Sequence, residues 1–466
     1  MAGPRLELTW PHKDEFLLVP KDDDGRPVWV PRDHPAAHEV RLTTPVAAVG
    51  GVGADPYADD TVFVGDSLDA LRVMCEVPEY AERYRGKVKL VYIDPPFNTG
   101  QTFTHYDDWM EHSVWLSFMR ERLLLIRELL APDGSVWVHL DDAEVHRMRC
   151  LLDEVFGSSG FIGTVVWENF YGRSNAAAIS PSQNYILVYS PQSKERWKYT
   201  RNLLPRQGAS LSKYSNPDDD PRGPWRSGPI FASEERHEGL MYEVETPSGR
   251  KIRPPRGSHW RMSKDDYEKM SEEGRIIYGS SGTGAPAIKL FLSEVQDGLV
   301  PRSLWPHVEV GHSQEGKREI QALFPAVEPF ATPKPERLLE RVIHIATDPG
   351  DIVLDCFGGS GTTAAVAHKM GRRWATVELS PATVADFVVP RLTKVVEGTD
   401  PGGITEAVGW AGGGGFRVVE VEPSLYEVGP GGLRLLDALL PKGYHLRLVE
   451  RFLVRSDDEE DNDDPE

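Results

Sequence analysis

The stretch VKLVYIDPPF (residues 88–97) joins a largely apolar run to an acid, two prolines and an aromatic ring. Such a run is typical of a strand that is buried on both faces of a parallel sheet. Proline donates no backbone hydrogen bond, so Pro95 and Pro96 predict the end of that strand. In α/β sheets, ligands bind beyond the carboxyl ends of the strands. The stretch is therefore either a plain turn or a rigid tip that holds Asp94 and Phe97 against a ligand.

Strand and helix patterns alternate on both sides of this stretch, which predicts an α/β domain with a largely parallel sheet. Before the middle of the chain we expect a strand and a helix within 61–74, a helix at 113–130 with Ser113 as its N-cap, a turn at 132–134, a strand at 135–140, and a helix at 142–156 that ends at Gly157. Later the pattern resumes with a helix at 335–347, a strand at 351–357, a helix at 361–370 and a strand at 372–379.

A second motif, LDCFGGSGTT (354–363), follows one of these later strands. Its glycines let the backbone turn sharply and approach a ligand closely, and the helix that follows offers free N–H groups. Glu378 lies 17 residues past Gly361, at the end of the next strand. An acid in that position suits the two hydroxyls of a ribose. The motif predicts a nucleoside-cofactor site, with an ordinary strand-to-helix turn as the alternative.

Together the two motifs resemble the β-class DNA adenine N6-methyltransferases, which include the modification (Mod) subunits of type III restriction-modification systems. Asp94 to Phe97 match the Asp/Asn/Ser-Pro-Pro-Tyr/Phe motif of the family, and Phe357, Gly359 and Gly361 match its Phe-x-Gly-x-Gly motif. In this class the catalytic motif precedes the cofactor motif and a target-recognition segment lies between them. This chain has that order, with the two motifs about 260 residues apart.

The resemblance implies a Rossmann-like methyltransferase domain with circularly permuted motifs, and S-adenosyl-L-methionine as the cofactor. VGDSLDAL (64–71) and TPKPERLLERVI (332–343) resemble the family segments near the adenine and the methionine end of the cofactor. The expected catalytic residues are Asp94, Pro95, Pro96 and Phe97. The expected cofactor-binding residues are Asp66, Lys334, Asp355, Phe357, Gly359, Ser360, Gly361, Thr362 and Glu378; no metal is expected. Phe97 stands where tyrosine is commoner, and Ser182-Gln183-Asn184 replaces an acid–histidine pair of many relatives.

These residue types suit methyl transfer to an exocyclic amino group. The Asp94 carboxylate and the Pro95 carbonyl accept hydrogen bonds from the NH₂, and the prolines fix both acceptors beforehand. A base inside a duplex cannot reach such a pocket and must flip out, where Phe97 offers a face to stack on. Aspartate at position 94 favours N6 of adenine, with N4 of cytosine as the alternative. The absence of a Pro-Cys motif disfavours methylation at C5 of cytosine.

The charge distribution indicates where DNA is read. Net charge is −20, but the segment after Ser456 alone carries eight acids, while residues 171–270 hold 17 Lys and Arg against 12 Asp and Glu. We expect this middle region to be an irregular, mostly β target-recognition insert. Its candidate DNA-binding residues are Arg222, Trp225, Arg226, Arg253, Arg256 and Arg261, with solvated loops and structural tryptophans as the alternative.

The predicted division of the 466 residues is an N-terminal extension at 1–58, the catalytic part of the methyltransferase domain at 59–170, the insert at 171–330, the cofactor-binding part at 331–400, a strand-rich segment at 401–455 and an acidic disordered tail at 456–466. Three scattered cysteines, no signal-peptide pattern and no long apolar run favour a cytoplasmic protein. Expected partners are double-stranded DNA, a second copy of the chain, and restriction or defence subunits. The alternative function is that of a DNA-recognition subunit in a defence complex, which methylates DNA only together with its partners.

Overall fold

In the computed structural model, the stretch that ends at Asp94 is strand β5 (Val88–Ile93), inside a ten-stranded sheet. The structure describes residues 7–19, 26–99, 101–102, 107–108, 110–173, 175, 177–206, 208–233, 238–279, 282, 284–328, 330–429 and 432–435. It divides the chain into two compact units: one runs from Leu203 to Pro301, and the other holds the residues on both sides of that segment.

The order of the sheet is β18-β9-β10-β8-β5-β19-β20-β4-β21-β3. Its strands are β18 (Leu304–Trp305), β9 (Phe161–Glu168), β10 (Gln183–Tyr189), β8 (Leu130–Leu140), β5, β19 (Ile352–Asp355), β20 (Arg373–Glu378), β4 (Asp60–Val64), β21 (Gly415–Val421) and β3 (Thr43–Gly50). The central run from β8 to β21 is parallel, while β10, β9 and β3 introduce antiparallel pairs. Strand β19 lies directly beside β5, although about 260 residues separate them in the chain.

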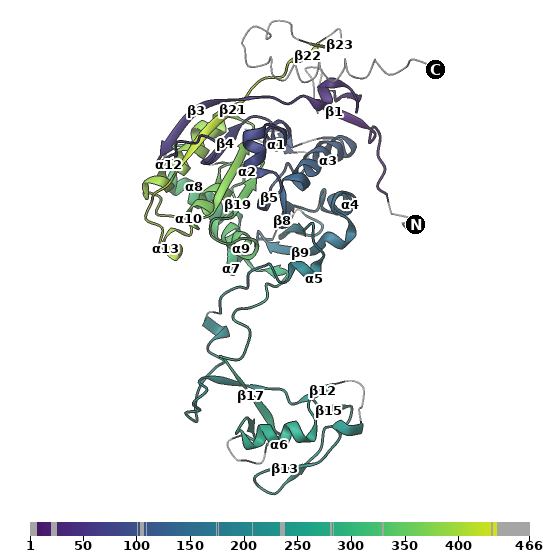
Figure 1. The fold of residues 1–466 in the computed structure, drawn as a ribbon, viewed down its shortest axis with the longest axis vertical. Helices are drawn as coiled ribbons and strands as arrows, with labels where there is room; N and C mark the ends of the chain where they lie inside the picture. The colour runs from purple at the N-terminus through teal and green to yellow at the C-terminus, as the bar shows by residue number, and fades with distance from the viewer. Residues whose placement is uncertain are drawn as a thin grey trace, which may run out of the picture. The chain divides into compact units, whose positions relative to one another are not determined.

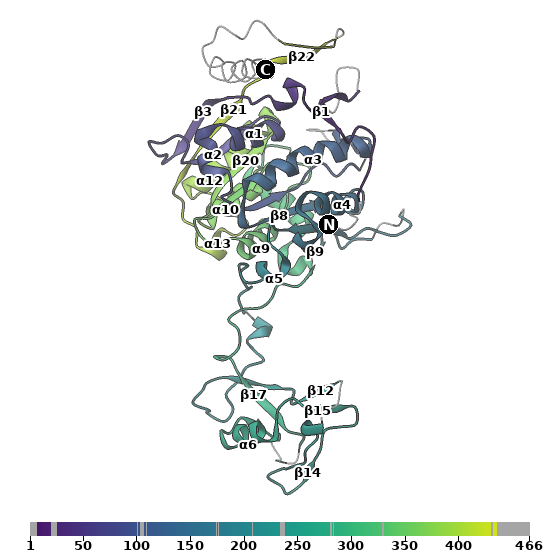
Figure 2. The same ribbon diagram turned by 45° about the vertical axis from the view of Figure 1, so that its right-hand side comes forward.

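Helices cover both faces of the sheet, and the direction of each crossover explains which face (Figures 1 and 2). One group, α1 (Ser67–Glu76), α3 (His112–Leu129) and α4 (Val145–Phe156), packs together. The other group is α9 (Glu336–Ala346), α10 (Thr362–Lys369) and α12 (Val389–Glu397). The chain crosses the sheet one way from β4 to β5 to β8 and the opposite way from β19 to β20. Because such crossovers are right-handed, their helices lie on opposite faces.

The apolar patterns of the sequence account for the main core. Strand β19 is buried along its whole length, and five of the six residues of β5 are buried, as expected for strands with neighbours on both sides. The side chains of Trp115, Trp167 and Trp374 in this unit are each no more than 1% exposed. None of the helices in the described part of the chain is long and apolar enough to cross a membrane.

The unit from Leu203 to Pro301 contains short strands and one helix of nine residues. Three strands pair in the order β11 (Trp225–Gly228), β17 (Ala287–Phe291) and β16 (Ile276–Ile277), and two hairpin-like pairs join β12 (Phe231–Ser233) to β15 (Ser258–Trp260) and β13 (Val244–Glu245) to β14 (Lys251–Ile252). Helix α6 (Lys264–Glu272) is capped by Ser263. A small core forms around Trp260, which is fully buried and stacks on Tyr242 at 5.3 Å between ring centroids.

This unit is narrower than the predicted insert at 171–330. The flanks of the insert supply β10 and β18 to the large sheet, so they belong with the unit that holds this sheet. Residues before 58, which carried no clear pattern, include edge strand β3 and the antiparallel pair β1 (Glu15–Val19) and β2 (Val28–Pro31). After β21, strands β22 (Tyr426–Gly429) and β23 (Gly432–Leu435) pair, and the predicted acidic tail lies outside the described residues.

Two local predictions need correction. Helix α3 begins at His112 with Glu111 as its N-cap, and the Ser113 hydroxyl donates to the Glu111 carboxylate at 2.7 Å instead of capping the helix itself. The expected turn at 132–134 is an irregularity within β8: Val88 pairs with Leu130 but Leu90 pairs with Ser135, so the extra residues bulge out of the ladder. The expected closure of α4 by Gly157 is confirmed, with φ at 81°.

Candidate functional site

The parallel strands bring the two predicted motifs to one edge of the sheet. Asp94 follows β5 directly, and Phe357 follows β19, the neighbouring strand. On the other side of β19, Glu378 ends β20 and pairs with Val64 of β4. Because parallel strands have their carboxyl ends at one edge, the acid-proline motif and the glycine loop lie next to each other.

Asp94 is joined by an ion pair to Lys334, the lysine of the predicted methionine-end segment. The Lys334 side chain is only 10% exposed, and its ammonium nitrogen lies 5.4 Å from the centre of the Phe97 ring. The indole N–H of Trp115 donates to the Pro96 carbonyl at 2.8 Å. The catalytic motif is thus held from the α3 side by a hydrogen bond and faces a buried cation.

Asn98 and Glu144 were not predicted, and they fix the end of the motif. Asn98 has a left-handed backbone (φ 61°). This conformation costs a non-glycine residue energy, which contacts with its surroundings must offset. Its side-chain NH₂ donates to the fully buried Glu144 carboxylate at 2.7 Å, and its carbonyl oxygen accepts from the Met110 N–H at 2.7 Å. Asparagine tolerates this conformation better than most residues, which was a usable signal in the sequence.

The glycine loop has the conformation that its sequence predicts. Gly359 and Gly361 have φ values of 50° and 76°, which side-chain-bearing residues rarely adopt. A Cβ added to Gly358 would stand 2.5 Å from the Thr376 hydroxyl, so this position also requires glycine. The Glu378 carboxylate accepts from the Gly359 N–H at 2.8 Å. Glu378 is therefore bound to the loop itself, and burial raises the pKa of its carboxyl.

A small cavity of about 30 Å³ connects the two motifs. The predicted residues that line it are Asp94, Lys334, Asp355, Phe357, Gly359, Ser360 and Thr362; they are joined by Tyr92, Phe330, Thr332, Pro333, Leu339, Gly358 and Thr363. Gly361 completes the loop as the N-cap of α10 but does not line the cavity.

Asp66 and Asp355 are both engaged with protein groups. Asp66 lies outside the cavity lining and caps α1 through the Leu68 N–H at 2.7 Å, and its two carboxylate oxygens accept from Arg122 at 2.8 and 2.9 Å. Asp355 lines the cavity and accepts from the Thr363 hydroxyl at 2.5 Å. Burial raises the pKa of Asp355 to about 7.

A buried charge network lies behind the glycine loop. The Glu336 carboxylate accepts from the Lys369 ammonium at 2.8 Å and from the Arg391 guanidinium at 2.8 Å. Arg391, which is fully buried, also donates to the Thr362 hydroxyl at 2.7 Å. The network therefore connects the start of α9, two residues past Lys334, to the first residue of α10.

Glu319 belongs to this network and makes the stability of the fold depend on pH. Its carboxylate accepts from the Glu336 N–H at 3.0 Å. Burial, and then the negative charge of Glu336, raise the pKa of Glu319 from 4.5 to about 7. A carboxyl whose pKa is raised by folding stabilises the fold below its ordinary pKa, and that contribution is lost as the pH rises through about 7.

We therefore expect Glu319→Gln to flatten the pH dependence of stability, since glutamine keeps an acceptor oxygen without gaining charge. Between pH 5 and pH 8 the melting temperature of the wild type should fall further than that of the variant. Thermal unfolding followed by fluorescence at both pH values gives the comparison. An equal fall in the melting temperature of the two proteins would show that the proton on Glu319 does not contribute to the pH dependence of stability.

The predicted DNA-binding residues lie in the second unit and differ in availability. Arg222 is paired through two hydrogen bonds with Asp220 at 2.7 and 2.8 Å and lies over the Phe291 ring. Trp225 donates to Asp218 at 2.8 Å, and Arg226 donates to the Tyr214 hydroxyl at 3.1 Å. The remaining three, Arg253, Arg256 and Arg261, are exposed; Arg253 pairs with Glu243 and Arg261 donates to the Phe231 carbonyl.

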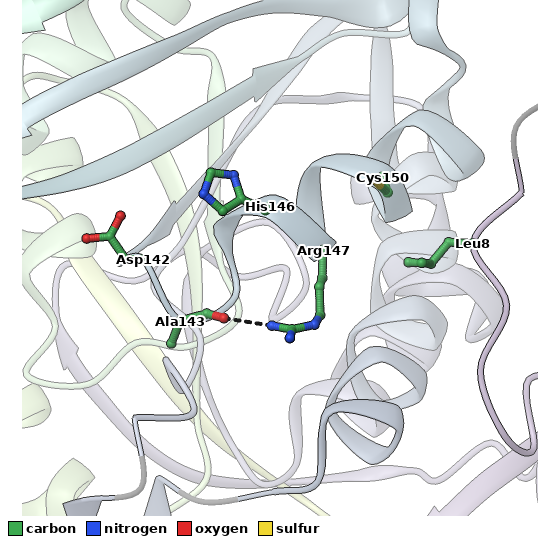
Figure 3. A pocket seen from close by; sticks show the side chains of 6 residues that line it. All are labelled: Leu8, Asp142, Ala143, His146, Arg147 and Cys150. Carbon is green, nitrogen blue, oxygen red and sulfur yellow. Dashed lines mark hydrogen bonds between the residues drawn. The ribbon is translucent and has the colours of Figure 1, made fainter.

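A larger hollow of about 480 Å³ lies over α4 and the N-terminal segment, apart from these motifs (Figure 3). Leu8, Asp142, Ala143, His146, Arg147 and Cys150 line it, and none of them is a predicted site residue. Arg147 donates back to the Ala143 carbonyl at 2.9 Å, as the dashed line shows. All three cysteines of the chain, including Cys150, are free thiols.

Comparison with known proteins points to one class. A family model described as DNA methylase matches residues 88–388. The StyLTI Mod subunit of a type III restriction-modification enzyme from Salmonella typhimurium is 31% identical over 65% of this chain and 48% of its own length. The type II methyltransferase M.EcaI from Enterobacter cloacae is 30% identical over 81% of this chain and 76% of its own. This chain spans about half the length of the type III relatives that it matches.

Among solved structures, a DNA modification methylase from Thermus thermophilus, crystallised with S-adenosyl-L-methionine, aligns with 78% of this chain and 99% of its own. The sequence identity is 16% and the TM-score is 0.37.

Proposed function

Since the chain belongs to the DNA methylase family, we propose that it transfers the methyl group of S-adenosyl-L-methionine to the N6 amino group of a flipped-out adenine in duplex DNA. One observation carries the proposal: a single cavity is lined both by Asp94 of the acid-proline motif and by the glycine loop. Methyl transfer requires such an arrangement, because the acceptor nitrogen and the methyl donor must meet in line.

The cavity residues fit the cofactor. The glycine loop offers backbone N–H groups and a close approach, while Asp94, Asp355 and Glu378 place acidic groups at the same edge of the sheet. When bound, S-adenosyl-L-methionine supplies a methyl group on a positively charged sulfur. The Phe330 ring lies over Gly359, at 3.4 Å from the position of a Cβ there, so this ring must turn aside to admit a ligand of that size.

Asp94 and the Pro95 carbonyl would orient the amino group of the base. Both accept hydrogen bonds from the NH₂, which directs the nitrogen lone pair at the methyl carbon. The new N–C bond forms as the C–S bond breaks, its electron pair goes to sulfur, and the surplus proton on nitrogen leaves to Asp94 or water. Phe97 would stack on the flipped base, an interaction worth about 1–3 kcal/mol per base.

Lys334 pairs with Asp94 when no base is bound. Its ammonium forms an ion pair with the Asp94 carboxylate, which is the acceptor that the base requires. Entry of the base would exchange one hydrogen-bond donor for another, so Asp94 never has to be buried without a partner. Once released, Lys334 would be free to pair with the carboxylate of the cofactor, as the resemblance of its segment to the family implies.

We further propose that the unit from Leu203 to Pro301 reads the DNA sequence, with its exposed Arg253, Arg256 and Arg261 as the first candidates. The pairing of Arg222 with Asp220 favours a structural part for that residue. The names of the relatives suggest restriction subunits as partners, and we propose defence subunits and a second copy of the chain as further partners.

The experiment is to incubate the purified chain with isotopically labelled S-adenosyl-L-methionine and mixed-sequence duplex DNA, alone and with the products of neighbouring genes. Mass spectrometry of the digested nucleosides should show N6-methyladenine. N4-methylcytosine would overturn the choice of base, since the family covers both reactions. Absence of any methylated nucleoside would overturn the proposed function.

A further inference from the structure

A buried histidine lies against the ring of the acid-proline motif. His139 is on β8, the strand next to β5, and none of its surface is exposed. Its ring stacks on Phe97, with 5.9 Å between the ring centroids and 27° between the planes. The Lys334 ammonium lies 5.4 Å from the centre of the same ring.

The orientation of the His139 ring is fixed independently of Phe97. A hydrogen bond of 2.7 Å joins its Nδ1 to the Tyr92 hydroxyl on β5. Trp167, fully buried on β9, lies at right angles to the imidazole, with 5.3 Å between the ring centroids and 88° between the planes. Contacts with Tyr92 on β5 and Trp167 on β9 therefore fix the orientation of the His139 ring in the absence of a ligand.

The imidazole also stays neutral. Burial, and then the positive charge of Lys334, hold the pKa of His139 well below its ordinary value. Burial, and then the charges of Asp94 and Asp355, raise the pKa of Tyr92, so its phenol keeps the proton that the hydrogen bond needs. A neutral ring can be packed against Phe97 without placing a second cation beside Lys334.

We propose that His139 is a positioning residue: its ring is a fixed plate that holds Phe97 at the angle needed to stack on the target base. This inference rests on the proposed function. A plate is needed because Phe97 has two rotatable bonds, and stacking is lost if the ring turns. The plain alternative is a core histidine that only joins β5 to β8 through Tyr92. The two hypotheses make different demands on position 139. Support of Phe97 requires a flat ring there, whereas the structural alternative requires the hydrogen bond to Tyr92.

Two double variants separate these readings. His139→Phe/Tyr92→Phe keeps a ring at position 139 and removes the hydrogen bond, whereas His139→Leu/Tyr92→Phe removes both. Neither leaves a buried phenol without a partner, and Tyr92→Phe alone is their common reference. The target site is first located by sequencing DNA that the wild type has methylated. Each protein is then titrated with two duplexes, one with the target base and one abasic at that position.

The ratio of the two dissociation constants measures how much the target base adds to binding. We expect the Phe/Phe variant to keep the ratio of the Tyr92→Phe reference and the Leu/Phe variant to lose about fivefold of it, a part of the stacking contribution of one base. Affinity for S-adenosyl-L-methionine and for the abasic duplex should stay equal between the two. If the Leu variant does not fold, His139→Met in the same background repeats the test.

Equal ratios in the two double variants would overturn the inference, and so would equal losses of cofactor affinity and base contribution. The wild type in the same assay reports separately on the proposed function. Failure of the wild type to methylate any DNA contradicts that function, whereas methylation combined with equal ratios contradicts only the part assigned to His139.

Discussion

Asp94→Asn is expected to lower the rate of methyl transfer about 100- to 1,000-fold, the usual cost of removing one preorganised hydrogen-bonding group from a transition state. Asparagine has the size of aspartate, but one oxygen becomes an NH₂ group. Only one oxygen would remain to accept from the NH₂ of the base, and the carboxylate charge that favours the developing positive charge on nitrogen would be gone. The measurement is the single-turnover rate with labelled cofactor.

The ion pair with Lys334 makes the choice of control important. Removing the Asp94 charge leaves a largely buried lysine without its carboxylate, so the melting temperature and cofactor affinity must be measured as well. Asp133→Asn is a matched control, because Asp133 pairs with Lys89 of the same strand β5 and is 45% exposed. That variant should transfer methyl groups at the wild-type rate. An Asp94→Asn protein that keeps more than a tenth of the wild-type rate would remove Asp94 from the reaction.

The parts of the fold that could be predicted are those in which local pattern and topology agree. The apolar run before Asp94 and the glycines after Phe357 each indicated a buried strand that ends in a functional turn, and both are confirmed as strand ends. That the two turns serve one site followed from the resemblance to a family with permuted motifs. Sequence periodicity alone gives no order of strands, because β19 enters the sheet beside β5 only after a long excursion of the chain.

The parts that could not be predicted depend on contacts between distant residues. The pairing of Lys334 with Asp94 spans 240 residues, and the bond between Asn98 and Glu144 spans 46. His139 reads in the sequence as an ordinary alternating residue of a strand, and only the register between β5 and β8 places it against Phe97. Likewise, Arg222 looked available for DNA until the structure paired it with Asp220.

The limits of the insert show the same dependence on distant contacts. Loss of periodicity begins near residue 171, yet β10 and β18 still extend the large sheet beyond that point. Strand β18 has only two residues and is identified by its pairing with β9, not by its composition. A boundary drawn from sequence pattern therefore falls where regular structure weakens, whereas the compact unit begins at Leu203.

Glu336→Ala should be the most destabilising of the substitutions considered, at about 3–5 kcal/mol, the usual cost of removing one partner from a buried ion pair. Lys369 and Arg391 would both lose a carboxylate while remaining buried, and the Ile404 N–H would lose its acceptor at 3.0 Å. Asp400, also paired with Lys369, offsets only part of the loss. Thermal and denaturant unfolding give the free-energy difference.

The matched control is Glu315→Ala, which removes a carboxylate from Arg337, the next residue along α9. That pair is partly exposed, so its loss should cost no more than about 1 kcal/mol. Because Arg391 also holds the Thr362 hydroxyl, Glu336→Ala should in addition weaken cofactor binding, which Glu315→Ala should not. A fall in stability no larger than that of the control would mean that the buried charges contribute little to the fold. A fall in stability with unchanged cofactor affinity would separate the network from the glycine loop and confine its effect to packing between α9, α10 and α12.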